Sequence, residues 1–526
     1  MSQQYQSLIG FTIGPIGEVM SHSKKSRELW CGSYFFSWYM KELFERINSC
    51  GSYEILIPFI GTIPKTRAGI YSDHLIARSI KNKQDTFDEI EDFNKQTLEL
   101  FSKLIADLKD PSAYSTVHTI LKDYLQIKFV VLDYPAHNPK DAELISIIDS
   151  HLLAFESNRS FTLGKSTETC QRCNILPSFT KEDIPFEEKN VRLCPICYLK
   201  LFHYNNSKWK SIVGRSFPST GEISTREFKI IDESKYNDFL RTKQKEDINE
   251  FEDEDFKKLS SEFGIKLKPY HKYFAIVTAD GDGVGSLAKN FTGTSPSDTL
   301  SKRLFDYSKS AIDLTNKYNG EMVYCGGDDL LAFMPVVTEK GIQTVIDFVK
   351  ELSDSYKSIV DKGTKQTSLS VGINIQYYKY PLSIGLDEAY QHEGKAKILK
   401  DSVAIQLTQH SGQSTKIHEK FDSHQQQHLC LILNRVLSGS IHLHHAMLHK
   451  LIMLKPLLVH ITNDDQIKNF FLNHFNEEVH NTSSGINFIR DILIEGRSKY
   501  GTAISEVVDN IIQYLRLAEF LRGEDE

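Results

Sequence analysis

The sequence lacks several features, and each absence narrows the class of protein. No run of apolar residues is long enough to cross a membrane, and the N-terminus lacks the apolar core of a secretory signal. Positive charge is not in excess, because 62 lysines and arginines face 69 aspartates and glutamates, for a formal net charge of −7. A nucleic-acid partner would therefore have to be bound by local basic patches. We expect a cytoplasmic protein.

An internal repeat at a fixed period is also absent, which argues against a repeat architecture. The composition is that of an ordinary globular protein, 40% hydrophobic and 25% charged, and 526 residues suggest three or four domains. Eight cysteines occur, and four of them form two Cys-x-x-Cys pairs. Such pairs indicate metal binding rather than a disulfide framework.

The two cysteine pairs are Cys170 with Cys173 and Cys194 with Cys197, separated by twenty residues. Each Cys-x-x-Cys can form a tight knuckle, and four thiolates together close a tetrahedron around Zn²⁺. Four cysteine ligands leave no open position on the metal, so we predict a structural zinc ribbon rather than a catalytic centre. Free thiols are the alternative.

A glycine-rich acidic turn stands out in the second half of the chain. Gly326, Gly327, Asp328 and Asp329 lie between two short apolar runs, 322–325 and 330–334. Two glycines between apolar runs predict a hairpin, because glycine adopts the positive φ angles of a tight turn. Two adjacent carboxylates at the tip of a buried hairpin are costly unless a cation neutralises them. A solvated turn without any ligand is the alternative.

A second acidic turn favours the metal site. The apolar run 273–279 predicts a buried central strand, and it ends in Asp280, Gly281 and Asp282. If this strand lies beside the hairpin, Asp280, Asp328 and Asp329 converge, and their hard oxygen ligands suit Mg²⁺ or Mn²⁺ held together with substrate phosphates. Gly281, Gly326 and Gly327 would let the backbone approach a triphosphate. Two such ions support nucleotidyl transfer. Asp282 is either a ligand or a turn residue.

The surrounding elements predict a ferredoxin-like palm with additions, in the order β-α-β-β-α-β-α-β. After the hairpin we expect a helix over 338–360, a strand over 369–377, a helix over 382–400 and a strand over 403–407.

These motifs together resemble the large polymerase/cyclase subunit of type III CRISPR effector complexes and, more distantly, diguanylate cyclases. The stretches that carry the resemblance are the turn after 273–279, the hairpin at 326–329, Tyr378–Leu382, Ala396-Lys397 and Gln409–Gly412. The resemblance implies that Lys397 holds the triphosphate of ATP. Without the resemblance, a solvated lysine on a helix face is the simpler interpretation.

The N-terminal region resembles the type III-B (Cmr) branch through Ile13–Ile16 and Ser26–Ser33. This implies a first, degenerate palm that faces the second one and holds no metal. Many relatives carry a His-Asp nuclease domain before that palm; no His-Asp dipeptide occurs here, so we expect no intrinsic DNase. Residues 68–75 also depart from the usual pattern, which puts the acceptor half of the pocket in question. The basic cluster at 24–27 is either a solvated helix face or a phosphate or RNA contact.

The predicted fold class is α+β, with two ferredoxin-like palms, a zinc-ribbon insertion and a C-terminal helical domain. The predicted boundaries are 1–160 for the first palm, 161–262 for the zinc module and an acidic linker or solvated helix, 263–412 for the catalytic palm and 413–526 for the helical domain. The resemblance implies guide CRISPR RNA, target RNA and other type III-B subunits as partners, including a small helical subunit bound by the C-terminal domain.

Three functions remain open. The first is a target-RNA-activated nucleotidyltransferase that uses ATP to make a signalling nucleotide, either a conjugate of AMP with S-adenosylmethionine, towards which we lean, or cyclic oligoadenylate. The second is a non-catalytic scaffold that binds guide RNA and partner subunits. The third is a stand-alone cyclic-dinucleotide synthase. An intact set of Asp280, Asp328 and Asp329 argues against the scaffold, and the additional domains argue against the stand-alone synthase.

Overall fold

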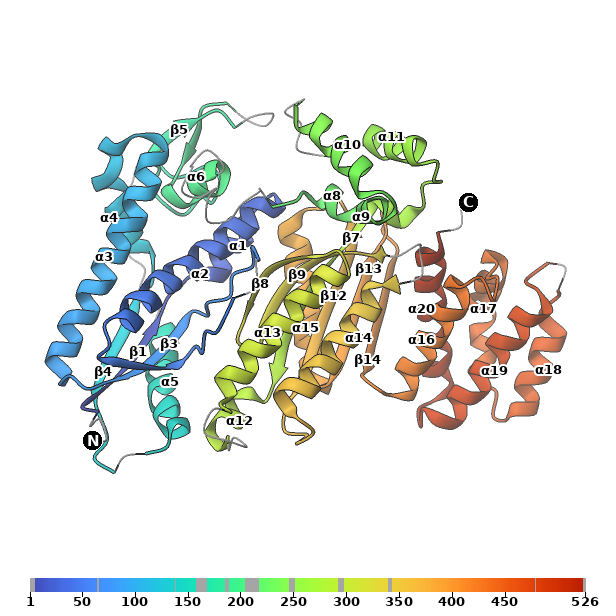
Figure 1. Ribbon diagram of the computed structural model, residues 1–526. Coiled ribbons are helices and arrows are strands. Elements are labelled where there is room, and N and C mark those ends of the chain that lie inside the picture. Colours follow the sequence, from blue (N-terminus) through green and yellow to red (C-terminus); the bar gives the residue numbers. More distant parts are fainter. Residues whose placement is uncertain are drawn as a thin grey trace.

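The computed structural model shows two sheets side by side, with helices stacked at one end (Figure 1). It describes residues 5–63, 66–137, 139–157, 168–184, 189–203, 217–245, 251–291, 298–338, 343–477 and 479–523. Within these stretches no helix is both long and apolar enough to span a lipid bilayer. The predicted domain boundaries stay predictions, and the one between 160 and 161 lies outside the described residues.

The first palm is a sheet of four antiparallel strands in the order β2-β3-β1-β4. Its strands are β1 (Ser7–Thr12), β2 (Tyr53–Ile57), β3 (His74–Ser79) and β4 (Lys128–Asp133). The helices α1 (Ile16–Ser21) and α2 (Ser26–Ser49) connect β1 to β2, and α3 (Lys83–Lys109) and α4 (Tyr114–Tyr124) connect β3 to β4. This order is the ferredoxin-like topology that the sequence predicts.

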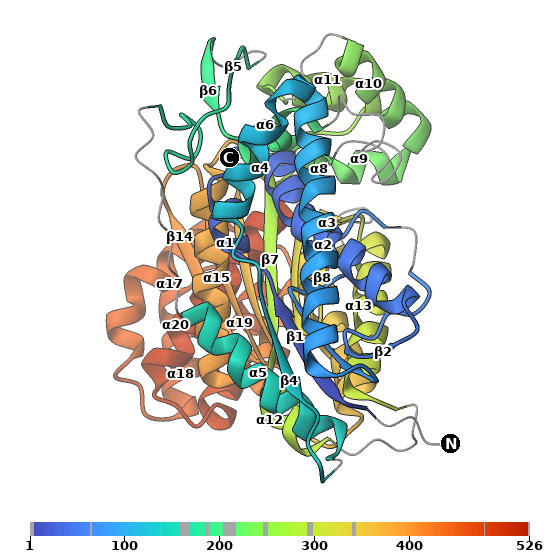
Figure 2. The same cartoon turned by 90° about the vertical axis from the view of Figure 1, so that its left-hand side faces the viewer.

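The sheet of the first palm is covered on both faces. Helix α2 packs into the larger apolar core, and α5 (Asp141–Ser157) covers the other face. The close approach of α5 requires a glycine in β1: a Cβ atom on Gly10 would lie 2.2 Å from Cγ2 of Ile148. Helix α5 also contacts α12 (Val284–Asn290) of the second palm, below the sheets in Figure 2.

The second palm repeats the strand order of the first and extends it to β14-β13-β12-β7-β9-β8. Its strands are β7 (Tyr273–Asp282), β8 (Glu321–Gly326), β9 (Asp329–Pro335), β12 (Ser368–Tyr377), β13 (Ser402–Thr408) and β14 (Ser414–Lys420). Strand β7 is central, and its alternate side chains enter two different cores, Ala275 and Val277 on one face and Phe274 and Ile276 on the other. Burial on both faces explains its nearly continuous apolar sequence.

The helices of the second palm divide between these faces. Helices α13 (Leu300–Lys317) and α14 (Val345–Tyr356) pack on one face, while α15 (Leu382–Leu399) and the first-palm helix α2 pack on the other. The predicted helix over 338–360 was wrong at its start. Thr338 and Thr344 belong to a short antiparallel ribbon, β10 (Val337–Thr338) and β11 (Gln343–Thr344), and the Thr344 side chain then caps α14.

Two small modules lie above the palms in Figure 1. The zinc ribbon contains β5 (Thr180–Glu182), β6 (Val191–Leu193) and α6 (Pro195–Phe202), and α6 packs on α2. The second module contains α8 (Thr220–Ser224), α9 (Arg226–Ile231), α10 (Glu233–Lys245) and α11 (Asp253–Phe263). It has its own apolar cluster, including Phe228, Tyr236 and Phe256, so this acidic stretch is more than a linker.

The C-terminal region is helical, as predicted. Its helices are α16 (His424–Leu437), α17 (His445–Leu458), α18 (Asp464–His474), α19 (Ser483–Lys499) and α20 (Ile504–Arg522). Their apolar core is continuous with that of the second palm, and the Tyr514 hydroxyl in α20 donates a hydrogen bond to Glu419 in β14. The described architecture confirms the predicted α+β fold class.

Candidate active site

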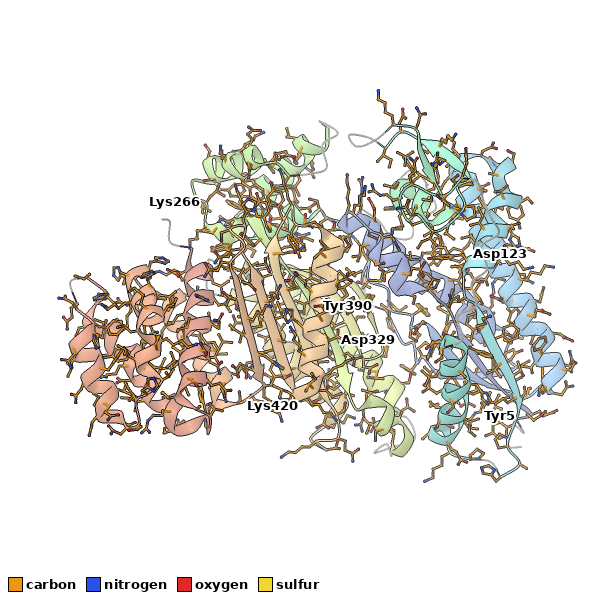
Figure 3. All side chains as sticks on the ribbon, turned by 180° about the vertical axis from the view of Figure 1, so that it is seen from behind. Tyr5, Asp123, Lys266, Asp329, Tyr390 and Lys420 are labelled. Carbon is orange, nitrogen blue, oxygen red and sulfur yellow. The ribbon has the colours of Figure 1, made fainter. Side chains whose placement is uncertain are left out.

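The end of β7 and the β8–β9 turn lie side by side, as predicted. Ala279 pairs with Leu330, so Asp280 and Asp329 follow one position beyond the last paired residues. A Cβ atom on Gly281 would lie 2.8 Å from Cβ of Asp328 and 2.6 Å from the Tyr356 hydroxyl, so only glycine allows this approach. Figure 3 shows Asp329 on the side of the second palm that faces the first palm.

The predicted glycine hairpin is confirmed. Gly326 pairs with Asp329 across a turn formed by Gly327 and Asp328, and Gly327 has a φ of +70°. A side chain on Gly326 would approach the backbone of Ser72 in the first palm at 3.6 Å. The turn therefore exposes backbone at the boundary between the palms, where a ligand could approach.

The electrostatics of the site show an excess of carboxylates. The ammonium nitrogen of Lys397 in α15 lies 2.5 Å from Oδ2 of Asp280. Burial, together with the charge of Asp280, raises the pKa of Asp328 to about 7. Packed protein around Asp329 and the neighbouring carboxylates raise its pKa well above the usual range, although part of the side chain stays open to solvent. Oxygen donors that repel one another fit a hard divalent cation such as Mg²⁺ or Mn²⁺.

A fourth carboxylate, Glu393, also belongs to the site, and sequence reasoning missed it. Its Oε1 lies 3.5 Å from the Lys397 ammonium nitrogen, one helical turn away, and burial raises its pKa. Helix α15 can lie this close to β12 only because residue 372 is glycine: a Cβ there would lie 2.3 Å from the carbonyl oxygen of Ala389 and 2.4 Å from the nitrogen of Glu393. The spacing of four residues from Lys397 is the signal that could have identified it.

Two tyrosines next to these carboxylates were also missed. The hydroxyl groups of Tyr324 in β8 and Tyr390 in α15 lie 3.1 Å apart, and Tyr390 keeps 36% of its surface exposed beside Asp329 (Figure 3). Burial raises the pKa of Tyr390 to about 12, so the pair stays neutral at physiological pH. The exposed ring offers an aromatic surface to a nucleobase.

Asp282 is a structural residue rather than a candidate ligand. Its carboxylate accepts hydrogen bonds from the hydroxyls of Ser368 and Ser370 in β12, at 2.5 and 2.7 Å. It also accepts one from the backbone nitrogen of Asp401, at 2.9 Å, in the connection between α15 and β13. Asp282 thus fastens both elements to the end of β7, and the open question about its role is answered.

The stretch that departs from the family pattern lies directly beside the hairpin. Gly69 donates from its backbone nitrogen to the carbonyl of Val323 at 3.0 Å and accepts from the nitrogen of Cys325 at 2.9 Å, so it extends the sheet past β8. Helix α2 holds this segment, because the Trp30 indole nitrogen donates to the carbonyl of Arg67 at 2.9 Å. Residues 67–72 therefore form a wall of the site.

An acidic cluster in the first palm continues this wall. Ligand atoms of Asp73, His74 and Glu156 all lie within 4.8 Å of one another, and His74 Nε2 lies 2.8 Å from Glu156 Oε1. Asp73 and Glu156 line a cavity of about 200 Å³ that also contains Thr12 and Lys128. The charge of Asp73 contributes to the raised pKa of Asp328, which places the cluster within electrostatic reach of the second palm. The unusual sequence at 68–75 was the only signal of this wall.

The four predicted zinc ligands come together. Their sulfur atoms lie within 4.8 Å of one another, and those of Cys173 and Cys194 are 3.9 Å apart. The backbone nitrogens of Arg172 and Cys197 each donate to a cysteine sulfur at 3.4 Å, which forms the two knuckles. This donor set fits a tetrahedral Zn²⁺ ion. The Arg172 guanidinium also forms a buried ion pair with Glu28 of α2 at 2.6 Å, which connects the ribbon to the first palm.

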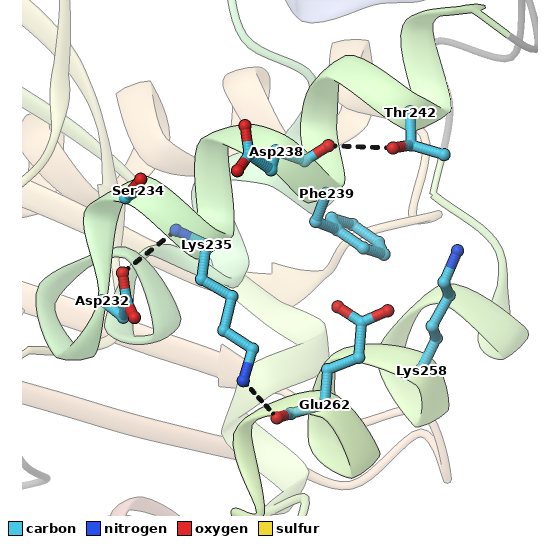
Figure 4. Close-up of a pocket in the computed structure, with 8 residues that line it drawn as sticks. All are labelled: Asp232, Ser234, Lys235, Asp238, Phe239, Thr242, Lys258 and Glu262. Carbon is cyan, nitrogen blue, oxygen red and sulfur yellow. Dashed lines mark hydrogen bonds between the residues drawn. The ribbon is translucent and has the colours of Figure 1, made fainter.

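Another hollow, of about 370 Å³, lies on α10 and α11 (Figure 4). Its polar groups satisfy one another: the Lys235 ammonium donates to the carbonyl of Glu262 at 2.5 Å, and the Thr242 hydroxyl donates to the carbonyl of Asp238 at 3.0 Å. Lys235 also donates from its backbone nitrogen to Asp232. None of the predicted site residues contributes to this hollow.

Comparisons with known proteins agree with this geometry. Residues 273–404 match the family model described as Cas10/Cmr2, second palm domain, and residues 8–109 match that of CRISPR-associated protein Cmr2, N-terminal. A curated relative, the CRISPR system Cmr subunit Cmr2 of Pyrococcus furiosus, is 27% identical over 238 residues. The match covers 40% of this chain and only 24% of that relative.

Solved structures share the fold at low sequence identity. The Type III-B Cmr-beta complex in its apo state matches with a TM-score of 0.62 and 13% identity, over 92% of this chain and 78% of the other. The same complex bound to cognate target RNA gives 0.61 and 14%, over 98% and 83%. A Csm1-Csm4 cassette in complex with cA4 gives 0.50 and 12%, over 98% and 70%.

Proposed function

We propose, because this chain belongs to the Cas10/Cmr2 family of CRISPR large subunits, that it is the nucleotidyltransferase of a type III-B effector complex and acts when target RNA pairs with the guide RNA. The observation that carries the proposal is the convergence of Asp280, Asp328 and Asp329 from two strand ends, with Lys397 among them. A scaffold would have no need for carboxylates that repel one another at a boundary between domains.

The donor half of the reaction follows from the second palm. Asp280, Asp328 and Asp329 would hold Mg²⁺ or Mn²⁺, which supplies activation of the attacking hydroxyl and neutralisation of the leaving pyrophosphate. Lys397, which pairs with Asp280 in this structure, would turn its ammonium group to the triphosphate of ATP, and Glu393 would keep that group in place. Gly281, Gly326 and Gly327 leave room for phosphate oxygens beside the backbone.

The acceptor half is where the first palm contributes. Asp73 and Glu156 place negative charge on the wall of the 200 Å³ cavity, which disfavours a second triphosphate and favours a cation. S-Adenosylmethionine carries a sulfonium and an ammonium group, and its ribose hydroxyl could attack ATP as another nucleotide would. We therefore favour a conjugate of AMP with S-adenosylmethionine as the product.

Cyclic oligoadenylate is the second candidate product. Lys128 lines the same cavity and could face a phosphate group of an acceptor ATP. The donor chemistry is identical in the two cases, because either acceptor offers a ribose hydroxyl to the same carboxylate site. Only the first-palm wall discriminates between them.

The remaining modules would serve assembly. The four cysteines would hold a structural Zn²⁺ ion, since a fully ligated tetrahedral site leaves no position for a substrate. The C-terminal helices would bind a small helical subunit, and guide RNA and target RNA would lie along the assembled complex.

Mass spectrometry of the products tests the function. The reconstituted complex, with guide and target RNA and Mg²⁺, is incubated with ATP in the presence or absence of S-adenosylmethionine. We expect a product that contains both AMP and methionine. Abundant oligoadenylate from ATP alone, without such a conjugate, would reject the favoured acceptor and leave the transferase in place. Absence of every nucleotide product would reject the transferase and favour the scaffold.

A further inference from the structure

A cavity of about 390 Å³ lies apart from the carboxylate site, where the start of α2, the α8 region and the start of α15 meet. We call it the α2–α15 cavity. It collects the two stretches that carry the family resemblance but have no role in the catalytic site, Ser26 onward in α2 and Tyr378–Leu382 before α15. Its lining includes Lys24, Lys25, Arg27, Phe217, Tyr378 and Lys379.

Two long helices begin at this cavity. Helix α2 starts after Lys25 and α15 starts after Pro381, and neither N-cap residue makes a side-chain capping hydrogen bond. The first N–H groups of a helix have no partner within the helix, and the helix dipole places partial positive charge at this end. Two such ends in one cavity favour an anion.

The side chains reinforce this preference. Four basic residues line the cavity against two acidic ones, Glu222 and Glu252, and each acid already faces a base. Glu252 accepts from Lys379 at 2.5 Å, and Glu222 lies 3.6 Å from the guanidinium of Arg226. The acids therefore do not cancel the positive potential that Lys24, Lys25 and Arg27 add at the start of α2.

A buried hydroxyl gives an independent indication of a ligand. Tyr378 is only 5% exposed, and its hydroxyl has no hydrogen-bond partner in the described part of the chain. The residue is held in position through its backbone, because its nitrogen donates to the carbonyl of Lys272 and its carbonyl accepts from the Thr220 hydroxyl, both at 2.9 Å. Buried hydroxyls without a partner are rare, and a phosphate or ribose oxygen would supply one.

We propose that the α2–α15 cavity binds a nucleotide phosphate, as a second site distinct from Asp280, Asp328 and Asp329. Its volume accommodates one nucleotide, with the phosphate at the two helix N-termini and a base against the rings of Phe217 or Tyr378. The phosphate belongs either to a single-stranded RNA or to a free nucleotide, and the same donors recognise both.

The test measures binding by the full chain with its zinc, in buffer without Mg²⁺, so that the carboxylate site lacks its metal. The probes are fluorescein-labelled octauridylate and fluorescently labelled ATP, followed by fluorescence anisotropy. The double variant Lys24→Gln with Lys25→Gln should weaken at least one probe about tenfold, since it removes two phosphate partners. Tyr378→Phe should weaken the same probe about threefold through the loss of one hydrogen bond.

The matched control is Lys95→Gln with Lys103→Gln, which removes two exposed lysines from α3 and leaves the cavity intact. A loss confined to octauridylate identifies an RNA site, and a loss confined to ATP identifies a free-nucleotide site; both support the proposal. Equal losses in the control variant, or unchanged affinities for both probes in both cavity variants, would overturn it. Thermal unfolding of each variant shows whether a loss of binding reflects misfolding, and Tyr378→Phe, which removes one atom, guards against that outcome.

Discussion

The two palms share one strand order and differ where their chains turn. In the second palm, β7 ends in a carboxylate, and β8 connects to β9 through only Gly327 and Asp328. In the first palm, β1 ends at Thr12 without a carboxylate, and a long connection, residues 58–73, replaces the tight turn between β2 and β3. The same topology thus produces a sharp acidic hairpin in one palm and an extended wall in the other.

The charges at corresponding positions differ in the same way. Asp73 precedes β3 as Asp328 precedes β9, and His74 begins β3 as Asp329 begins β9. In the first palm the histidine pairs with Glu156, so the charge is balanced internally. In the second palm the carboxylates face one another, and burial with Asp280 raises the pKa of Asp328. A divalent cation is needed only where the protein leaves the charge unbalanced.

The largest expected effect is at the acidic hairpin. Asp328→Asn with Asp329→Asn should reduce nucleotide product at least about a thousandfold, because the amides cannot hold the metal. Complex assembly and RNA binding should stay intact, since these side chains add little to the core. Product formation by the reconstituted complex is measured by mass spectrometry, and assembly by size-exclusion chromatography.

The control is the corresponding residue of the first palm, Asp73→Asn, which should keep the transfer chemistry. Full product formation by the double variant would disprove the assignment of the hairpin, and complete inactivity of Asp73→Asn would remove the distinction between the palms.

The next effect separates the palms by their supports. Cys194→Ser should release zinc and lower stability by several kcal/mol, because a structural zinc site contributes directly to folding. The loss should reach the first palm, which the ribbon contacts through the Arg172–Glu28 ion pair and through Lys200, whose ammonium donates to the carbonyl of Val19 at 2.7 Å. Hydrogen exchange should increase in α2 and leave β12 protected.

Cys50→Ser is the matched control, because Cys50 lies outside the cysteine cluster. Metal analysis that finds no zinc in the native protein, or exchange that increases equally in β12, would contradict this prediction.

A third comparison uses one glycine from each sheet. Gly372→Ala should cost about 2–3 kcal/mol and also reduce activity, because its Cβ would meet the backbone of α15 and displace Glu393 and Lys397. Gly10→Ala should cost less, since the atoms nearest its Cβ belong to the side chains of Ile148, Leu152 and Val130, which can rotate. Urea unfolding and product yield are compared for the two variants; a larger cost at Gly10 would refute the argument.

A fourth effect concerns the acceptor. Asp73→Asn with Glu156→Gln should raise the KM for S-adenosylmethionine about tenfold while the KM for ATP changes little, because only the cationic acceptor loses a partner. An unchanged KM for S-adenosylmethionine would exclude the first-palm wall from acceptor recognition. This variant therefore distinguishes acceptor binding from the donor chemistry of the second palm.

Local patterns predicted much of the second palm, and distance along the chain hid the rest. The apolar run of β7, the glycine hairpin and the two cysteine pairs are contiguous signals, and the structure contains all three. The acidic wall joins His74 to Glu156, which are far apart in sequence and meet only because α5 folds over β1. Glu393 depends similarly on the close packing that Gly372 permits.

The smallest expected effect is a pH dependence that belongs to the first palm. Burial alone would lower the pKa of His74, but the hydrogen bond with Glu156 and the charges of Asp73 and Glu156 raise it to about 9. Because this is above the value of about 6.5 in an unfolded chain, the pair's stabilisation is complete below pH 6.5 and is lost as the pH rises through 9. Glu156 is 38% exposed, so solvent screening reduces the contribution to about 1 kcal/mol.

The same sign applies to Asp328, whose raised pKa means that the fold favours its neutral form and loses that contribution as the pH rises through 7. The measurement is therefore made in the Asp328→Asn, Asp329→Asn background, where only the first palm titrates in this way. Urea unfolding at pH 6 and at pH 9.5 is compared with and without His74→Gln. We expect the histidine to stabilise the protein at pH 6 and to make no difference at pH 9.5. Equal stabilisation at both values would show that His74 contributes by packing rather than by charge, and the contrast in charge between the two palms would then be wrong.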